Sequence, residues 1–126
     1  KIKSKRHLMD SISILKISKR KSDYIIALYD SIIEKNLNVN KIINLKDEDF
    51  KDNLCKYKGV GPWTCDMILI FFLRRQNVFP VNDLIINKTK EKLFKLHNSK
   101  IDLKKKFSPY LSIFSLHLWK MSKRIL

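Results

Sequence analysis

The chain has 126 residues, of which 44% are hydrophobic, and it carries a formal net charge of +15 at pH 7. This length allows one domain with a modest core, and the apolar content excludes a disordered chain. No apolar run reaches the length of a membrane span, and the basic opening residues lack the apolar stretch of a secretory signal, so we expect an intracellular protein. The positive charge predicts a polyanionic partner such as nucleic acid, although a lysine-rich surface can also serve solvation alone.

The residues that commonly bind metals are few and scattered. Cys55 and Cys65 are too few for a disulfide framework, a zinc set or an iron–sulfur cluster, and we expect both to be buried thiols. His7, His97 and His117 have no cysteine or carboxylate at metal-ligand spacing. The sequence therefore predicts no metal site built from side chains.

Two amphipathic helices are expected in the first half of the chain. From Lys19 to Asn36 the apolar residues follow a helical stripe, and Ser18 precedes it as an N-cap. The stripe consists of Ile25, Leu28, Tyr29, Ile32 and Ile33. A second helix is expected from Asp47 to Tyr57, because acidic residues fill its first turn, where the helix dipole favours them.

Both glycines of the chain lie in the stretch YKGVGPWTCDM, residues 57–67. Gly59 and Gly61 would allow a positive φ and the close approach of another backbone. Pro62 stands where a new helix should begin, and we expect that helix to run to about Leu73 and to be central, since it is apolar nearly all round. Its N-terminal N–H groups could bind an anion such as a DNA phosphate, but a plain tight corner explains the two glycines equally well.

The stretch NVFPVND, residues 77–83, is expected to be a loop, because Pro80 disfavours helix at the residue before it. Asp83 is a candidate N-cap for a helix from Leu84 to about Leu96. A polar connection, HNSKIDLKKK, follows this helix.

The last helix is expected to open with Ser108 as its N-cap and Pro109 as its first residue. Its expected shared face consists of Tyr110, Ile113, Phe114, Leu118 and Met121. No segment alternates in the manner of a strand, so the predicted fold class is all-α.

Four stretches of the chain, in order, resemble the helix-hairpin-helix DNA glycosylases, specifically the 3-methyladenine DNA glycosylase II branch. They are ISKRKSDYI (17–25), LKDEDFKDNLCKYKGVGPWTCDMILIFFL (45–73), VFPVNDLIIN (78–87) and SPYLSIFSLHLW (108–119). The specific part is the hairpin followed by the VFPxxDL pattern. The resemblance implies an orthogonal helical bundle with a helix-hairpin-helix motif, spanning residues 1–126 as one glycosylase domain that lacks the family's first helices.

The resemblance also implies roles for particular residues. Asp83 would be the catalytic carboxylate, and Trp63 would line the pocket that receives a flipped base. The DNA-binding residues would be Lys58, Gly59, Val60, Gly61 and Thr64. A Na⁺ or K⁺ ion held by backbone carbonyls near Gly59 and Gly61 would support the hairpin. From the residues alone, Asp83 could equally be an ordinary N-cap and Trp63 a core residue.

A single carboxylate suits the chemistry that the resemblance implies. Breaking an N-glycosidic bond builds positive charge on the sugar, and an anion in a water-poor pocket stabilises that charge. Alkylated purines such as 3-methyladenine and 7-methylguanine are already cationic, so they leave easily, and an indole face attracts them by about 0.5–2 kcal/mol. Relatives that also cut the strand carry a lysine where this chain has Trp63, so we expect no lyase activity. Their iron–sulfur cluster needs four cysteines and this chain has two, so we expect no cluster either.

The resemblance thus implies a monomeric, DNA-associated hydrolase of base excision repair. It would remove alkylated purines from double-stranded DNA and leave an abasic site, in the nucleus of a eukaryote or the nucleoid of a bacterium. Two other interpretations stay open: a non-catalytic helix-hairpin-helix DNA-binding module, and a glycosylase for another damaged or mismatched base. The chain departs from the family at Leu111, where an arginine is usual.

Overall fold

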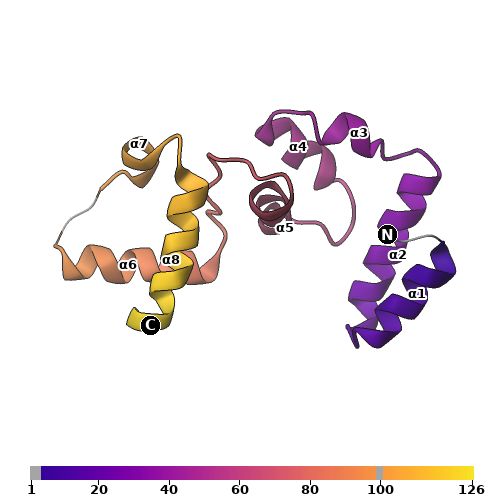
Figure 1. Cartoon of the computed structure of the whole chain (residues 1–126), viewed down its shortest axis with the longest axis horizontal. Coiled ribbons are helices and arrows are strands. Elements are labelled where there is room, and N and C mark those ends of the chain that lie inside the picture. Colours follow the sequence, from indigo (N-terminus) through magenta and orange to yellow (C-terminus); the bar gives the residue numbers. More distant parts are fainter. Residues whose placement is uncertain (1–3, 99–100) are drawn as a thin grey trace. The chain divides into compact units, whose positions relative to one another are not determined.

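The computed structural model describes residues 4–98 and 101–126, and these fold into α-helices and one π-helical stretch with no strand among them. The expected all-α class is therefore confirmed. The chain divides into two compact units, Lys1–Val60 and Gly61–Leu126 (Figure 1). Residues 1–3 of the basic opening stretch, and Ser99 and Lys100 of the expected polar connection, lie outside the described residues. Within the described ranges, no helix is both long enough and apolar enough to cross a bilayer.

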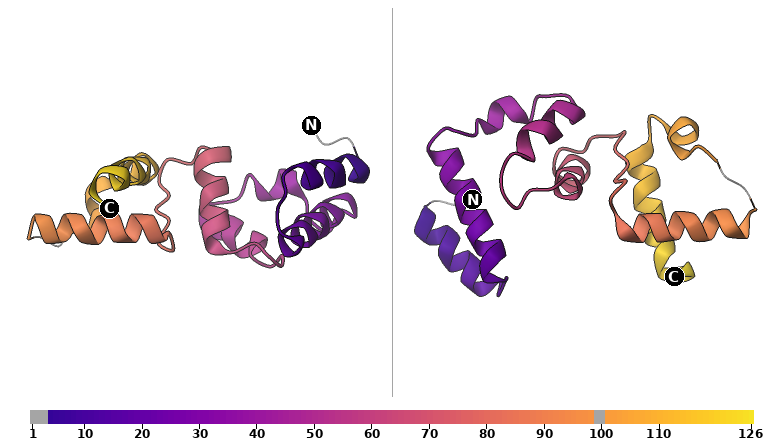
Figure 2. Two further views of the ribbon diagram at one scale, coloured as in Figure 1. Left: turned by 90° about the horizontal axis from the view of Figure 1, so that it is seen from below. Right: turned by 180° about the vertical axis from the view of Figure 1, so that it is seen from behind.

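The described part of the first unit, residues 4–60, contains four helices. They are α1 (Lys5–Ile14), α2 (Lys19–Ile33), α3 (Val39–Ile42) and α4 (Asp47–Leu54). Helices α1 and α2 lie side by side as a hairpin, which the views of Figure 2 show from two further directions. Ser18 caps α2 as expected, since its side chain accepts a hydrogen bond from the Lys21 N–H. We did not predict α1 or the single-turn α3 from the sequence.

The apolar stripe of α2 is not the core of this unit. No residue of α2 is buried, and Ile33 is 61% exposed. The buried apolar side chains are instead Leu8, Leu37, Phe50 and Leu54. Helix α2 also ends earlier than expected, because Lys35 takes a positive φ and the Leu37 N–H bonds back to the Ser31 carbonyl, which closes the helix.

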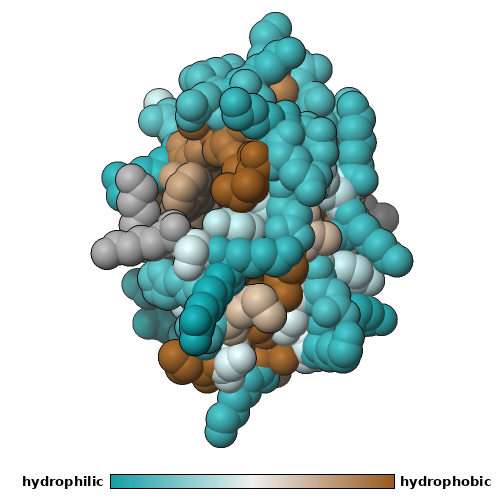
Figure 3. Space-filling view, turned by 90° about the vertical axis from the view of Figure 1, so that its right-hand side faces the viewer, coloured by the Kyte–Doolittle hydropathy of each residue, from teal (hydrophilic) through white to brown (hydrophobic). Residues whose placement is uncertain are grey.

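One face of the molecule is mainly hydrophilic. Figure 3 shows this face, on which hydrophilic side chains surround separate hydrophobic areas. Such a surface fits a chain in which 31% of the residues are charged.

The second unit is built around a packed pair of helices. Its elements are α5 (Pro62–Met67), the π-helical η1 (Ile68–Phe72), α6 (Leu84–Leu96), α7 (Leu103–Phe107) and α8 (Leu111–Ile125). Helices α6 and α8 pack against each other, and the small side chains Thr89 and Ser115 are completely buried on them. Pro62 begins α5 and Asp83 caps α6, both as the sequence predicted.

The helix from Pro62 is less central than its sequence indicated. Cys65 and Leu69 are buried, but Phe72 is 77% exposed. The π-helical geometry of the second half turns Leu69 and Ile70 inward, while Phe71 and Phe72 face outward. Cys55 is only half-buried, so the prediction of two buried thiols holds for Cys65 alone.

The last helix differs from its prediction in both its start and its inward face. It begins at Leu111, because Ser108 ends α7 and Tyr110 is the N-cap residue. Its buried residues are Leu111, Ser112, Ser115 and Leu118, whereas Tyr110 and Ile113 are exposed. Serine lies inward because the Ser112 hydroxyl donates to the Arg75 carbonyl at 2.6 Å and accepts from the Val78 N–H at 3.0 Å. These bonds satisfy backbone groups of the loop before α6.

Candidate functional site

Asp83 lies where the loop after η1 meets the start of α6. Its Oδ1 accepts the Ile86 N–H at 2.8 Å, which is the N-cap bond that the sequence predicted. The loop is held by two further bonds: the Asp83 N–H donates to the Pro80 carbonyl at 3.0 Å, and the Asn87 amide donates to the Val81 carbonyl at 2.8 Å. The carboxylate is therefore held by a bond to the first turn of α6, and its backbone by bonds within the loop before α6.

Two indole rings also donate to this carboxylate. Trp63 Nε1 lies 2.8 Å from Oδ2, and Trp119 Nε1 lies 3.2 Å from Oδ1. Trp63 comes from the first turn of α5 and Trp119 from the second half of α8. The ring of Trp119 is stacked on Phe71 of η1, with centroids 5.7 Å apart, which holds the second indole. Three separate elements thus converge on one carboxylate.

The hydrogen bonds control the charge of Asp83. Burial raises the pKa of this carboxyl, since only 6% of the residue is exposed. The backbone N–H of Ile86, the indoles of Trp63 and Trp119 and the backbone N–H of Ile85 outweigh burial and hold the pKa below its usual value. Asp83 is therefore ionised at neutral pH.

An open pocket of about 360 Å³ lies beside the carboxylate. It is lined by Trp63, Asn82, Asp83, Leu84 and Ile85. The Trp63 residue is 48% exposed, so its ring faces the pocket region while its N–H is bonded to Asp83. A fixed anion and an accessible indole thus share one pocket, which suits a cationic planar ligand.

The two glycines of the hairpin have different structural roles. Gly59 has φ +88°, and a Cβ built on it would overlap the ring and the Cβ of Tyr24. Gly61 has φ −106°, and nothing lies within 4 Å of its added Cβ. Within the chain, only Gly59 requires glycine, so the expectation of special backbone geometry at both glycines is wrong for Gly61. Its open side leaves room for the backbone of a partner.

The remaining hairpin residues lie near the boundary between the two units. Lys58 is exposed, while Val60 and Thr64 are half-buried. Gly61 is the N-cap residue of α5, and its carbonyl accepts the Cys65 N–H at 3.1 Å. No group of three histidine, cysteine or acidic side chains within residues 4–98 and 101–126 is arranged to hold a metal ion.

Comparison with known proteins gives the family. The candidate DNA-3-methyladenine glycosylase YfjP of Bacillus subtilis is 34% identical over 111 residues, which cover 84% of this chain and 39% of that protein. The DNA-3-methyladenine glycosylase of Saccharomyces cerevisiae is 30% identical over 141 aligned positions, which cover 84% of this chain and 47% of that protein. Among solved structures, a DNA-3-methyladenine glycosidase from Bacillus halodurans matches 94% of this chain and 59% of its own, with a TM-score of 0.69 and 25% identity.

The chain belongs to the helix-hairpin-helix DNA glycosylase superfamily. No protein-family model matches it. The chain spans less than half the length of the two glycosylases named from Bacillus subtilis and Saccharomyces cerevisiae. The resemblance read from the sequence is confirmed, and so is the likeness to the DNA glycosylase fold.

For this glycosylase-superfamily member, sequence reasoning missed one residue of the site. The structure brings Trp63 and Asp83 together, but it also adds Trp119, which is 36 residues from Asp83 in the chain. A signal was present, because the chain has only two tryptophans and both donate to Asp83. A buried indole N–H needs an acceptor, and a nearby carboxylate is a natural one.

Proposed function

We propose that this chain is a monofunctional DNA N-glycosylase. It removes alkylated purines such as 3-methyladenine and 7-methylguanine from double-stranded DNA and leaves an abasic site. The observation that carries the proposal is the ionised Asp83 carboxylate, held by two indole N–H groups beside an open pocket. The names of the relatives support the choice of alkylated purines.

In this reaction Asp83 acts on the sugar. As the bond to the base breaks, positive charge develops at C1′, and a fixed carboxylate in a partly desolvated pocket stabilises it. The hydrogen bonds from Ile86, Trp63 and Trp119 keep the carboxylate ionised and aimed, so it needs no rearrangement during the reaction. The same anion can orient the attacking water.

Trp63 has two roles in the proposed reaction. Its N–H positions Asp83, and its exposed ring surface attracts the cationic base. Extrusion of a base from the duplex costs a few kcal/mol, and less for a damaged base, which adds selectivity for the lesion.

The hairpin from Lys58 to Thr64 is proposed to bind a DNA phosphate. The open side of Gly61 lets a phosphate approach the first N–H groups of the helix that begins at Pro62. Carbonyls near Gly59 and Gly61 would hold a Na⁺ or K⁺ ion, since a carbonyl oxygen that accepts one hydrogen bond keeps a second lone pair. Such an ion would add positive charge beside the phosphate.

The absence of lyase activity is proposed from the same pocket. Strand cleavage by a glycosylase needs an amine that forms a Schiff base with the sugar. None of the described residues that line the Asp83 pocket is a lysine, and Trp63 occupies the position at the start of the second hairpin helix. The product should therefore be an intact strand with an abasic site.

The test is base release from duplex DNA that carries a single 7-methylguanine, followed by alkaline cleavage of abasic sites. We expect release by the wild type and a loss of about 100-fold or more in Asp83→Asn, which removes the charge but keeps an N-capping side chain. Asp102→Asn is the matched control, because Asp102 caps α7 in the same unit and accepts from the Lys105 N–H. Its release rate should match that of the wild type.

Three outcomes would contradict the proposal. Tight, salt-sensitive DNA binding without any base release would favour a non-catalytic DNA-binding module. Strand breaks that form without alkali would show lyase activity. Release of an oxidised or mismatched base in preference to 7-methylguanine would assign another lesion to the same site.

A further inference from the structure

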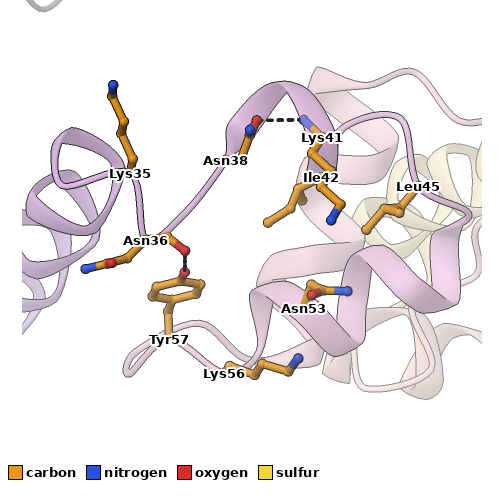
Figure 4. A pocket seen from close by; sticks show the side chains of 9 residues that line it. All are labelled: Lys35, Asn36, Asn38, Lys41, Ile42, Leu45, Asn53, Lys56 and Tyr57. Carbon is orange, nitrogen blue, oxygen red and sulfur yellow. Dashed lines mark hydrogen bonds between the residues drawn. The ribbon is translucent and has the colours of Figure 1, made fainter.

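A second pocket lies in the first unit, among the residues that follow α2, the short α3 and the end of α4 (Figure 4). Its volume is about 440 Å³, which falls in the range of small-molecule sites. Lysine and asparagine side chains predominate in its lining, and no acidic residue is among the described residues that line it. The proposed glycosylase reaction uses none of these residues.

Two lysines supply positive charge to this pocket. In Figure 4 the Lys41 side chain reaches from α3 toward Asn53 of α4, and Lys56 lies along the opposite edge, whereas Lys35 points outward. Neither Lys41 nor Lys56 makes an ion pair with any of the described residues. The carboxylate bonded to a lining residue is that of Glu34, which accepts the Asn36 amide at 3.1 Å. Two lysines with no carboxylate between them favour an anionic ligand.

Two asparagines present one donor and one acceptor. Asn38 Oδ1 accepts the Lys41 backbone N–H at 3.0 Å, and its Nδ2 has no acceptor within the part of the chain that the structure describes. Asn53 Nδ2 donates to the Asp49 carbonyl at 2.8 Å, which leaves its Oδ1 to accept. The local backbone bonds thus fix the orientation of both amides. A donor and an acceptor on fixed side chains suit the polar edge of a nucleobase.

An aromatic ring completes the pocket. The Tyr57 hydroxyl donates to the Asn36 carbonyl at 3.1 Å, which joins the segment after α4 to the segment after α2 (Figure 4). This bond holds the ring at the pocket wall, opposite the apolar side chain of Ile42. Any of the nucleobases can stack on such a ring, since every base has a π-face.

We propose that this pocket binds a nucleotide unit, with its phosphate at Lys41 and Lys56 and its base against Tyr57. The pocket volume is far larger than one phosphate needs, and the amides and the ring give the remaining space a chemistry that matches a base. The nucleotide can come from two sources: a free mononucleotide, or an unpaired nucleotide of a DNA strand. Both carry the same phosphate and the same base, so one pocket serves either.

The first test is a titration of the full chain with deoxyadenosine 5′-monophosphate, deoxyadenosine and inorganic phosphate, followed by NMR of the asparagine side-chain amides. We expect the monophosphate to shift the Asn38 and Asn53 signals and to bind at least about tenfold more tightly than either part alone, because phosphate and base contacts add. Equal affinity for the monophosphate and for inorganic phosphate would overturn the assignment of a base site. Binding that leaves both amides unshifted would overturn the location.

Two matched pairs of lysine substitutions distinguish binding in this pocket from a general effect of the protein's net charge. Lys41→Gln with Lys56→Gln should weaken the monophosphate at least about tenfold, since both cations at the phosphate are lost. Lys21→Gln with Lys123→Gln removes the same charge from exposed lysines outside the pocket and should change the affinity less than about twofold. Circular dichroism checks that all four substitutions leave the helices intact. Equal losses in the two pairs would overturn the proposal.

Asn53→Leu and Asp83→Asn complete the set. Asn53→Leu keeps the size of the side chain, and it should reduce the advantage of the monophosphate over inorganic phosphate; an unchanged advantage would count against a base contact. Asp83→Asn should leave the affinity unchanged, and a change in either direction would place the nucleotide in the Asp83 pocket instead. The result is independent of whether the chain releases bases.

A fluorescent single-stranded 12-mer identifies the source. If the 12-mer displaces the monophosphate, and if Lys41→Gln with Lys56→Gln weakens binding of the 12-mer, the pocket holds a nucleotide of the strand. If the 12-mer binds without displacing the monophosphate, the pocket takes a free mononucleotide. A 12-mer that displaces the monophosphate equally well in both lysine pairs would overturn the pocket assignment.

Discussion

The Asp83 carboxylate is buried and yet ionised, because N–H donors replace the water that it has lost. Two of these donors are backbone groups at the start of α6, and two are indoles that come from α5 and α8. The backbone pair comes with any well-formed N-cap, whereas the indole pair comes from two other helices, α5 and α8. The indoles are therefore the residues through which the charge of Asp83 can be altered without breaking α6.

Trp119→Phe should raise the pKa of Asp83. The substitution removes one donor and keeps an aromatic ring for the stack on Phe71, so burial acts with less opposition. NMR titration of the carboxyl measures the shift directly, and the acid limb of base release should move to higher pH by the same amount.

Phe71→Leu is the control for the Trp119 substitution. It disturbs the ring stack and leaves the hydrogen bond donor present. A carboxyl pKa that moves in Phe71→Leu as much as in Trp119→Phe would show that packing, and not the indole N–H, controls the charge.

Asp83 should also make the stability of the protein depend on pH. Its folded pKa lies below its unfolded value, so its contribution to the free energy of unfolding is complete above the unfolded pKa and is lost as pH falls through the folded pKa. Urea unfolding at pH 7 and at about pH 3 should show a smaller loss in Asp83→Asn than in the wild type. An identical loss in both proteins would mean that other carboxyls dominate the acid limb.

At the scale of elements, alanine variants of the two hairpin glycines distinguish a glycine that the fold requires from one that contacts DNA. Gly59→Ala should lower the free energy of unfolding by about 2 kcal/mol or more, because the φ of +88° disfavours a side chain and the new Cβ overlaps Tyr24. Gly61→Ala should leave stability within about 0.5 kcal/mol, since its backbone is extended and the space around it is open. Thermal or urea unfolding gives both values.

The same pair of variants tests the phosphate contact. If a DNA backbone approaches Gly61 closely, Gly61→Ala should weaken duplex binding at unchanged stability. An unchanged affinity in this variant would remove Gly61 from the DNA interface and leave it a residue without a structural explanation.

The helices that the sequence predicted well are those whose signals are local. Asp83 caps α6 through a bond to Ile86, three residues away, so the start of that helix can be read from a short window. The inward face of α8 was mispredicted apart from Leu118, because Ser112 is held by Arg75 and Val78, which lie 37 and 34 residues away. The bond from Trp119 to Asp83 has the same character. Periodicity weighs hydrophobicity alone and cannot indicate which loop carbonyl needs a partner.

At the scale of the whole molecule, charge is divided unevenly between the two units. Residues 61–126 contain 13 of the 27 basic residues but only 4 of the 12 acidic ones, and Asp83 is one of those four. Lys1–Val60 holds the other eight acidic residues, three of them in the first turn of α4. The unit with the Asp83 site is thus the more positive of the two, which supports the proposed binding of DNA.

The salt dependence of duplex binding decides whether this charge serves DNA or only solvation. Each phosphate that the protein neutralises should add about −0.9 to the slope of log K against log salt, so four contacts would give a slope near −3.6. Fluorescence anisotropy with an undamaged duplex at several salt concentrations measures this slope without any contribution from base release. Asp83→Asn should bind at least as tightly as the wild type, since it removes a negative charge from a positive unit. A slope close to zero would mean that the lysines are spread over a solvated surface, and the proposed contact at the hairpin would then have to act without charge neutralisation.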